Sequence, residues 1–393
     1  MLLEFEMKKL ADNILSWCEN PEDGAVKQAI NISKHPWLVG NVCLMPDTHE
    51  GYGMPIGGVV ALNNAICPNM VGVDIGCGML AMKTAIKEIT KQQLEDIYSE
   101  IKGCIPVGFK HNSEKQKHLV FTEYMWDGGN TPVCEREFES AQYQIGTLGG
   151  GNHFIEIQRD EDGYIWFMIH SGSRNLGKQV AEFYNKKAEE LCERFKQYKI
   201  VEDELAVLPV GTSEFEMYKQ EMGLCLEFSL ANREVMAHKI MQCFDKVIKK
   251  DGIFPYSYIN IQHNYASLEN HYGKNVFVHR KGATKAREGK LGIIPGSQGT
   301  SSYIVEGLGN KASLCSCSHG AGRKMSRKKA RENLDIENEK RALEEKGIIH
   351  SIRSVEDLDE AASAYKDIDE VMEQQKDLVK IVTKISPLAV IKG

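Results

Sequence analysis

The sequence predicts an α+β fold, with mixed sheets and surrounding helices in a single large domain over residues 1–393. Helical and strand patterns both occur but do not alternate regularly, as they would in an α/β protein. Glycine gathers at 51–78, 146–151, 172–177, 282–299 and 307–322, which is typical of distant loops that meet around one ligand. No repeat, low-complexity tract or Pro/Ser-rich linker divides the chain.

Local patterns predict the individual elements. Short apolar runs predict strands at 58–62, 154–157, 165–169, 258–261 and 275–278. Apolar residues at three- and four-residue spacing predict helices at 176–199, 216–250 and 326–346, the last strongly charged and mostly exposed. Ser354, with Glu356 and Asp357 after it, is typical of an N-cap followed by an acidic first turn.

Composition excludes several classes of protein. Hydrophobic residues make up 42% and charged residues 26%, as in a globular protein with ample core. Without a run of about 18 apolar residues or an apolar signal core, we expect a cytoplasmic protein with no membrane partner. The eleven cysteines are expected to be reduced thiols, a few of them metal ligands. With a net charge of −7, contacts with nucleic acid would be confined to two local basic segments, 279–290 and 323–331. The alternative is that these segments are simply solvated surface.

One glycine-rich segment combines an acid with a thiol. In Gly72-Val73-Asp74-Ile75-Gly76-Cys77-Gly78, the glycines let the backbone turn so that Asp74 and Cys77 can reach one cation. The alternative is a turn with a buried cysteine. Histidines strengthen the metal interpretation, because each lies where an expected strand meets a loop, so that its side chain is held rigidly beside an open space. They are His153, His170 and His263.

These ligand types alone would favour zinc, because thiolate is not the usual ligand of manganese. Five ligands could also hold two ions if the thiolate bridges them, an arrangement that suits phosphoryl chemistry.

Two further segments suit a nucleotide. In Ser318-His319-Gly320-Ala321-Gly322-Arg323, a neutral imidazole that can attack phosphorus precedes a glycine turn whose N–H groups can approach phosphate. The segment 295–302 (PGSQGTSS) offers N–H groups and hydroxyls in one short loop. Either could instead be an ordinary turn. The P-loop motif G-x-x-x-x-G-K-[ST] is absent from the sequence, which excludes that class of NTPase as far as the motif can.

Together these segments resemble the RtcB family of RNA ligases, almost from end to end of the chain. The matching segments lie in this order: 45–53 (MPDTHEGYG), 72–78 (GVDIGCG), 151–156 (GNHFIE), 170–174 (HSGSR), 262–264 (QHN), 279–284 (HRKGAT), 295–297 (PGS), 319–323 (HGAGR), 364–367 (AYKD) and 392–393 (KG). The resemblance implies the family's own α+β fold, the RtcB-type fold, rather than a Rossmann or ATP-grasp ligase.

The resemblance also implies an activity. It would be a GTP- and Mn²⁺-dependent joining of RNA 3′-phosphate or 2′,3′-cyclic phosphate ends to 5′-hydroxyl ends, in RNA repair or tRNA splicing. His319 would take GMP from GTP, and the RNA would pass through a 3′-pp-5′-G intermediate. The resemblance implies two Mn²⁺ ions per active site in place of the zinc that the ligand types alone would favour. Cys77 would bridge the two ions, and Asp74, His153, His170 and His263 would complete the ligands. Asp47 would orient His319. Whether an activator protein is a further partner stays open.

The same resemblance implies a nucleotide pocket in which Glu156 and Lys392 recognise guanine. Its other members are Asn152, Asn264, Pro295, Gly296, Ser297, Gln298, Ser302, Gly320, Ala321, Gly322 and Tyr365. Basic side chains then serve as anchors for RNA phosphates; they are Arg174, Arg280, Lys281 and Arg323.

Residues 152–156 present a conflict. In a regular strand Asn152 and Glu156 would face away from His153, which separates guanine from metal. Either the strand begins after His153, or the nucleotide wraps around the strand end; we favour the second.

Two other functions remain open. A metal-dependent RNA-end phosphoesterase or cyclic phosphodiesterase would need the metals, but not His319 or Lys392. A non-catalytic RNA-binding protein would need neither the metal ligands nor the nucleophile His319.

Overall fold

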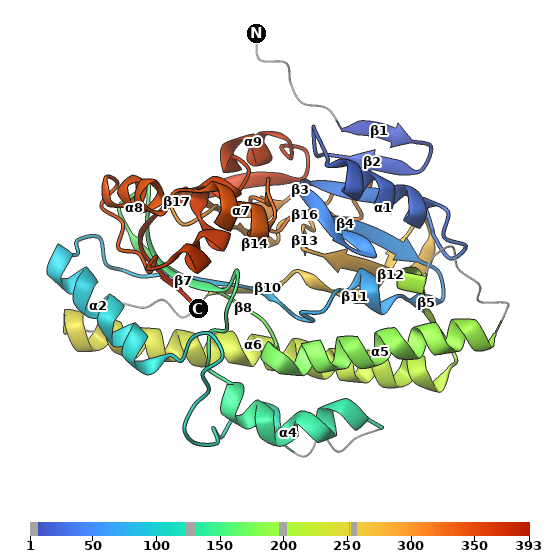
Figure 1. The fold of residues 1–393 in the computed structure, drawn as a ribbon, viewed down its shortest axis with the longest axis horizontal. Helices are drawn as coiled ribbons and strands as arrows, with labels where there is room; N and C mark the ends of the chain where they lie inside the picture. The colour runs from blue at the N-terminus through green and yellow to red at the C-terminus, as the bar shows by residue number, and fades with distance from the viewer. Residues whose placement is uncertain (1–6, 123–129, 196–202, 251, 253–257) are drawn as a thin grey trace, which may run out of the picture.

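The computed structural model describes residues 7–122, 130–195, 203–250, 252 and 258–393. Two large sheets form its centre, with helices packed around them (Figure 1). This arrangement confirms the expected α+β class. Within the described residues, no helix has the length and apolar character needed to cross a bilayer.

The six-stranded sheet carries the first half of the site. Its order is β1-β2-β3-β4-β12-β11, and β2 and β3 are its one parallel pair. The bounds are β1 Lys8–Ala11, β2 Ile14–Ser16, β3 Val42–Tyr52, β4 Met54–Leu62, β12 Lys274–Lys281 and β11 Asn264–His271. Helix α1 (Asp23–Ser33) covers one face with Ala29 and Ile32, which pack against Val60 and Leu62.

The seven-stranded sheet is antiparallel throughout, in the order β10-β6-β8-β7-β17-β15-β14. The bounds are β10 Ile259–Gln262, β6 Gly78–Lys83, β8 Ile165–Ser171, β7 Phe154–Asp160, β17 Val379–Lys392, β15 Ser302–Gly307 and β14 Leu291–Ile294. Two short pairs complete the strands: β5 (Ala65–Ile66) with β9 (Leu208–Pro209), and β13 (Ala283–Lys285) with β16 (Ser316–Ser318).

Long helices cover one face of the seven-stranded sheet. Figure 1 shows α5 (Arg174–Arg194) and α6 (Ser213–Ile248) side by side, with α4 (Pro132–Gln144) beyond them. Thr212 begins α6, because its hydroxyl accepts from the Phe215 N–H at 3.2 Å. Met236, Ile240 and Phe244 of α6 then pack with α2 (Lys91–Cys104) against the sheet. This core fixes the strands whose ends build the site.

The C-terminal part adds short helices on the other side of the molecule (Figure 1). They are α7 (Arg327–Asn333), α8 (Ile336–Glu344) and α9 (Ile368–Glu373), with 3-10 helices η5 (Val355–Glu360) and η6 (Ala362–Ala364) between them. Three further 3-10 turns are η1 (Pro68–Met70), η2 (Leu119–Phe121) and η4 (Asp203–Leu205).

Each expected strand is present, but two other expectations need correction. The single helix expected over 326–346 is two helices, because Leu334 is extended and Asp335 caps α8 by accepting from the Asn338 N–H at 2.8 Å. The expected N-cap at Ser354 is confirmed, with Glu356 and Asp357 in the first turn of the 3-10 helix η5. Strand β7 begins at Phe154, so the alternative that we did not favour for 152–156 is the observed one. Residues 196–199 of the expected helix lie outside the described residues.

Candidate active site

The ends of four neighbouring strands bring the expected metal ligands together. Along the order β10-β6-β8-β7, His263 follows β10, Cys77 precedes β6, His170 lies in β8 and His153 precedes β7. Antiparallel pairing places these strand ends on the same side of the sheet, since Gln262 pairs with Gly78 and His170 pairs with Phe154. Sheet register therefore gathers residues that are far apart in sequence.

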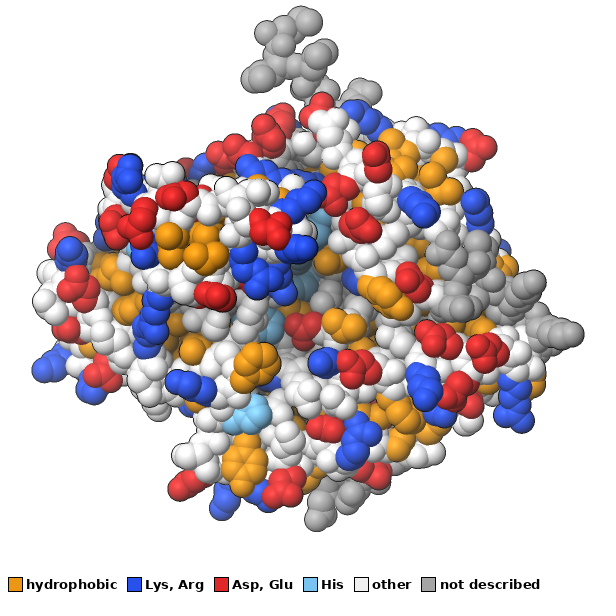
Figure 2. All heavy atoms as spheres, in the orientation of Figure 1, with side chains coloured by type: hydrophobic (Ala, Val, Ile, Leu, Met, Phe, Trp, Pro, Cys, Tyr) orange, Lys and Arg blue, Asp and Glu red, His pale blue; other side chains and the backbone are white. Residues whose placement is uncertain are grey.

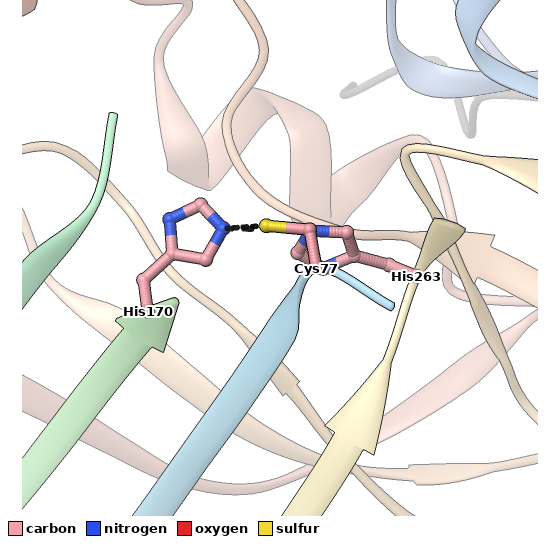
Figure 3. A group of neighbouring side chains, drawn as sticks. All are labelled: Cys77, His170 and His263. Carbon is pink, nitrogen blue, oxygen red and sulfur yellow. Dashed lines mark hydrogen bonds between the residues drawn. The ribbon is translucent and has the colours of Figure 1, made fainter. Parts of the chain in front are cut away.

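Cys77 lies at the centre of the cluster. Its Sγ is 3.2 Å from His170 Nε2 and 3.5 Å from His153 Nε2, and His170 Nε2 is 3.4 Å from His263 Nε2. Figure 3 shows the His170 ring and the Cys77 sulfur directed at each other from their strands. Two groups share the thiol: Cys77, His170 and His263 form one, and Asp74, Cys77 and His153 the other.

The donor set fits a cation. The Nδ1–H of His153 donates to the Leu148 carbonyl at 3.1 Å, and that of His170 donates to the Asn152 carbonyl at 3.0 Å. Each ring thus keeps its Nε2 lone pair for a metal. Nitrogen and sulfur ligands of one tetrahedral ion lie roughly 3.4–3.6 Å apart, close to the distances observed.

Electrostatics agree with that fit. Burial, reinforced by neighbouring positive charge, lowers the pKa of His170 and His263 well below the usual value, so both rings are neutral. Burial and the Asp74 carboxylate raise the pKa of the Cys77 thiol. A thiolate at this position therefore requires a neighbouring cation.

His319 lies beside this cluster, on the loop after β16. Its ring centroid is 4.8 Å from that of His263, and its Nδ1 is 2.6 Å from Asp47 Oδ2. The same carboxylate oxygen accepts from the backbone N–H groups of His319 and Gly320. Burial opposes ionisation of Asp47, but the interactions with His319 outweigh it and lower the pKa of the carboxyl group. Asp47 therefore fixes both the ring and its loop.

Gly322 makes this contact between the loop and β3 possible. Its φ is +74°, and a Cβ there would lie 2.2 Å from the Asp47 carbonyl oxygen. A larger residue at position 322 would push the His319 loop away from β3.

A cleft of about 1110 Å³ connects His319 and the metal cluster to the expected nucleotide residues. Figure 2 shows histidine deep in a hollow on this face, with Lys and Arg side chains on one side of it. Most of the expected nucleotide residues line the cleft: Asn152, Glu156, Asn264, Pro295, Gly296, Ser297, Gln298, Gly320, Ala321, Gly322, Tyr365 and Lys392. Ser302 lies behind it, where its hydroxyl accepts from the Gly296 N–H at 3.2 Å.

Glu156 and Lys392 lie on paired strands at the end of the cleft formed by β7 and β17. Burial raises the pKa of Glu156 to about 8, although Lys392 and a hydrogen bond from Gln158 oppose this shift. Burial also lowers the pKa of the Lys392 ammonium. A buried acid and a partly buried base thus share one end of the cleft.

The four basic residues expected to bind RNA differ in their surroundings. Arg323 and Lys281 line the cleft, and Lys281 also donates to the carbonyls of Tyr52 and Asn69. Arg174 begins α5, where its Nε donates to Thr147 Oγ1 at 3.0 Å.

The expectation for Arg280 needs correction. Its side chain is fully buried, and its guanidinium donates to Glu269 Oε1 at 2.6 Å, Ser316 Oγ at 2.9 Å and the Leu314 carbonyl at 3.0 Å. It has no surface to offer to an RNA phosphate. Its role in this structure is to join β11, β12 and the segment before β16.

Sequence reasoning missed several residues of the cleft. His49 lies within the quoted segment 45–53, and Arg327 lies within the basic segment 323–331, so both had a local signal. Glu360, buried in the lining of the cleft, had no local signal apart from its place five residues before Tyr365.

Comparison with known proteins gives one consistent result. The family model described as "tRNA-splicing ligase RtcB" matches residues 28–393. The chain is 36% identical over 400 residues to "RNA-splicing ligase RtcB" of Escherichia coli (strain K12), with 95% of each chain covered. It is 34% identical over 444 residues to "tRNA-splicing ligase RtcB" of Nanoarchaeum equitans, covering 95% of this chain and 92% of that protein. Against "RNA-splicing ligase RtcB homolog 1" of Entamoeba dispar the identity is 33% over 465 residues, covering 100% and 85%.

Proposed function

Because this chain belongs to the RtcB family, we propose that it is an RNA ligase that uses GTP and Mn²⁺. It joins RNA ending in a 3′-phosphate or 2′,3′-cyclic phosphate to RNA beginning with a 5′-hydroxyl, in RNA repair or tRNA splicing. The observation that carries the proposal is the placement of His319, held by buried Asp47 and adjacent to the Cys/His/Asp cluster in one cleft.

His319 is the proposed nucleophile. Asp47 accepts the Nδ1–H, which leaves the Nε2 lone pair free to attack the α-phosphorus of GTP. An N–P bond forms, the bond from phosphorus to the bridging oxygen breaks, and pyrophosphate leaves. The RNA 3′-phosphate then takes GMP from His319, and the 5′-hydroxyl oxygen displaces GMP to form the phosphodiester. A 3′-phosphate alone is a poor electrophile, which is why the GMP is needed.

Asp74, Cys77, His153, His170 and His263 would hold Mn²⁺, since Cys77 belongs to both groups of ligands. Mn²⁺ held there would supply charge neutralisation for the phosphates and activation of water. The Cys/His set would also suit zinc, so the assignment of Mn²⁺ rests on the family.

The remaining partners follow from the cleft. Guanine is assigned to the end with Glu156 and Lys392, and the triphosphate to the glycine turn after His319. RNA phosphates are assigned to Arg174, Lys281 and Arg323. An activator protein remains a candidate partner.

Incubation with GTP labelled at the α-phosphate and Mn²⁺ tests the proposal. We expect label on the protein that is labile to acid and stable to alkali, and that is lost in His319→Ala. His238→Ala, on α6 away from the cleft, is the matched control and should label normally. Absence of label, with release of phosphate from RNA ends, would instead indicate a phosphoesterase.

A further inference from the structure

Glu360 is a buried carboxylate at the end of the cleft assigned to the nucleotide, and basic and hydroxyl groups surround it. It is 4% exposed and ends η5. Its Oε1 is 3.3 Å from Arg323 Nη1 and 3.1 Å from Arg327 Nε. Its Oε2 accepts from the Tyr365 hydroxyl and lies 3.7 Å from Lys392 Nζ. Four donors therefore surround one carboxylate.

Three of these donors form hydrogen bonds with Glu360, and Lys392 adds an ion pair at a longer distance. A carboxylate offers about four lone-pair positions, so Glu360 is nearly filled by its own neighbours. Glu156 receives one side-chain hydrogen bond, from Gln158 Nε2 at 2.7 Å. Of the two acids, Glu156 therefore has more acceptor positions left for a ligand.

Lys392 lies within the influence of both acids. Its ammonium forms an ion pair with Glu360 at 3.7 Å, whereas its attraction to Glu156 acts over a longer distance. A buried ammonium needs a carboxylate partner. If the charge of Glu360 were removed, Glu156 would attract Lys392 most strongly, ahead of Asp359.

We propose that Glu360 is a positioning residue that holds Lys392 away from Glu156 and so leaves Glu156 free to hydrogen-bond the nucleotide base. The inference rests on the proposed use of GTP. It explains why Glu156 and Lys392, which are proposed to recognise guanine, do not form an ion pair with each other. Glu360 also orders Tyr365, Arg323 and Arg327 along the same wall.

The test is the GTP dependence of self-guanylylation in Glu360→Gln, which keeps the size and removes the charge. We expect the KM for GTP to rise roughly 10- to 100-fold, the worth of a hydrogen bond to a charged group, while the rate at saturating GTP changes less than about threefold. Glu360→Asp should restore most of the affinity. Glu356→Gln, an exposed position on the same 3-10 turn, is the matched control and should behave as wild type.

A second measurement separates positioning from a general structural role. In a Glu156→Gln background the main carboxylate that competes with Glu360 for Lys392 is gone, so adding Glu360→Gln should raise KM less than about threefold. An unchanged KM in the single variant, or equal effects in both backgrounds, would overturn the inference. A loss of rate at saturating GTP together with a lower Tm would also overturn it. If wild type takes no label from GTP, the proposed function itself has failed.

Discussion

Asp47→Asn tests the central contact of the site, the support of His319 by a buried carboxylate. Asp47 is fully buried, and its Oδ2 receives three donors: His319 Nδ1 at 2.6 Å, His319 N at 3.0 Å and Gly320 N at 3.3 Å. Asparagine keeps the shape, and its amide oxygen can still accept, but the negative charge is lost. The perturbation thus weakens three hydrogen bonds without opening a cavity.

The expected magnitude follows from these three bonds. A hydrogen bond to a charged group is worth about 1 kcal/mol more than one to a neutral group. Losing this difference at two or three bonds costs about 2–3 kcal/mol in the step where His319 becomes positive, which corresponds to roughly a 30- to 160-fold slower reaction.

The assay is single-turnover guanylylation at saturating GTP, with Tm measured in parallel. Asp12→Asn, in the exposed turn between β1 and β2, is the matched control and should keep the wild-type rate. The reasoning is refuted if Asp47→Asn takes label as fast as wild type while remaining folded.

Three other predictions concern the metals, the base and the fold. Cys77→Ala removes the ligand common to both groups, so bound Mn²⁺ per chain, measured by elemental analysis after dialysis, should fall by more than half; an unchanged metal content would contradict the assignment. Burial raises the pKa of Glu156 to about 8, and an N–H of guanine binds the ionised carboxylate of Glu156 more strongly than the protonated one. The KM for GTP should therefore fall as pH rises from 6 to 8. That dependence should vanish in Glu156→Gln. Glu269→Gln leaves buried Arg280 without its carboxylate, which should cost about 3–5 kcal/mol in the free energy of unfolding by urea titration. Arg280 and neighbouring cations outweigh burial and lower the folded pKa of Glu269, so its contribution is present above the unfolded pKa and is lost as pH falls; equal acid sensitivity of wild type and variant would contradict this.

Local sequence patterns predicted the elements better than their breaks. The spacing of apolar residues located α5 and α6, because a helix that covers a sheet must repeat its buried face. The break at Leu334 was missed, although Asp335 is of a residue type that favours an N-cap over a helix interior. The charged residues on both sides continue the helical spacing, which hid this local signal.

The candidate site shows the same division. Strand-end histidines and the Asp-x-x-Cys segment indicated the candidate metal ligands, but nothing local states that β10, β6, β8 and β7 are neighbours. Arg280 was assigned to RNA because a basic segment suggests surface. Its burial follows from the pairing of β12 with β11, which brings Glu269 alongside it. Pairing between strands is the information that a single sequence lacks.

The position of β17 has a consequence for biosynthesis. This strand lies between β7 and β15, in the interior of the seven-stranded sheet, although both neighbours precede it by many residues in the chain. While the ribosome is still making residues 379–392, β7 and β15 each have an unpaired edge, and such edges invite wrong pairing with other chains. We therefore expect the seven-stranded sheet to close only after residues 379–392 have been made and β17 inserts between β7 and β15.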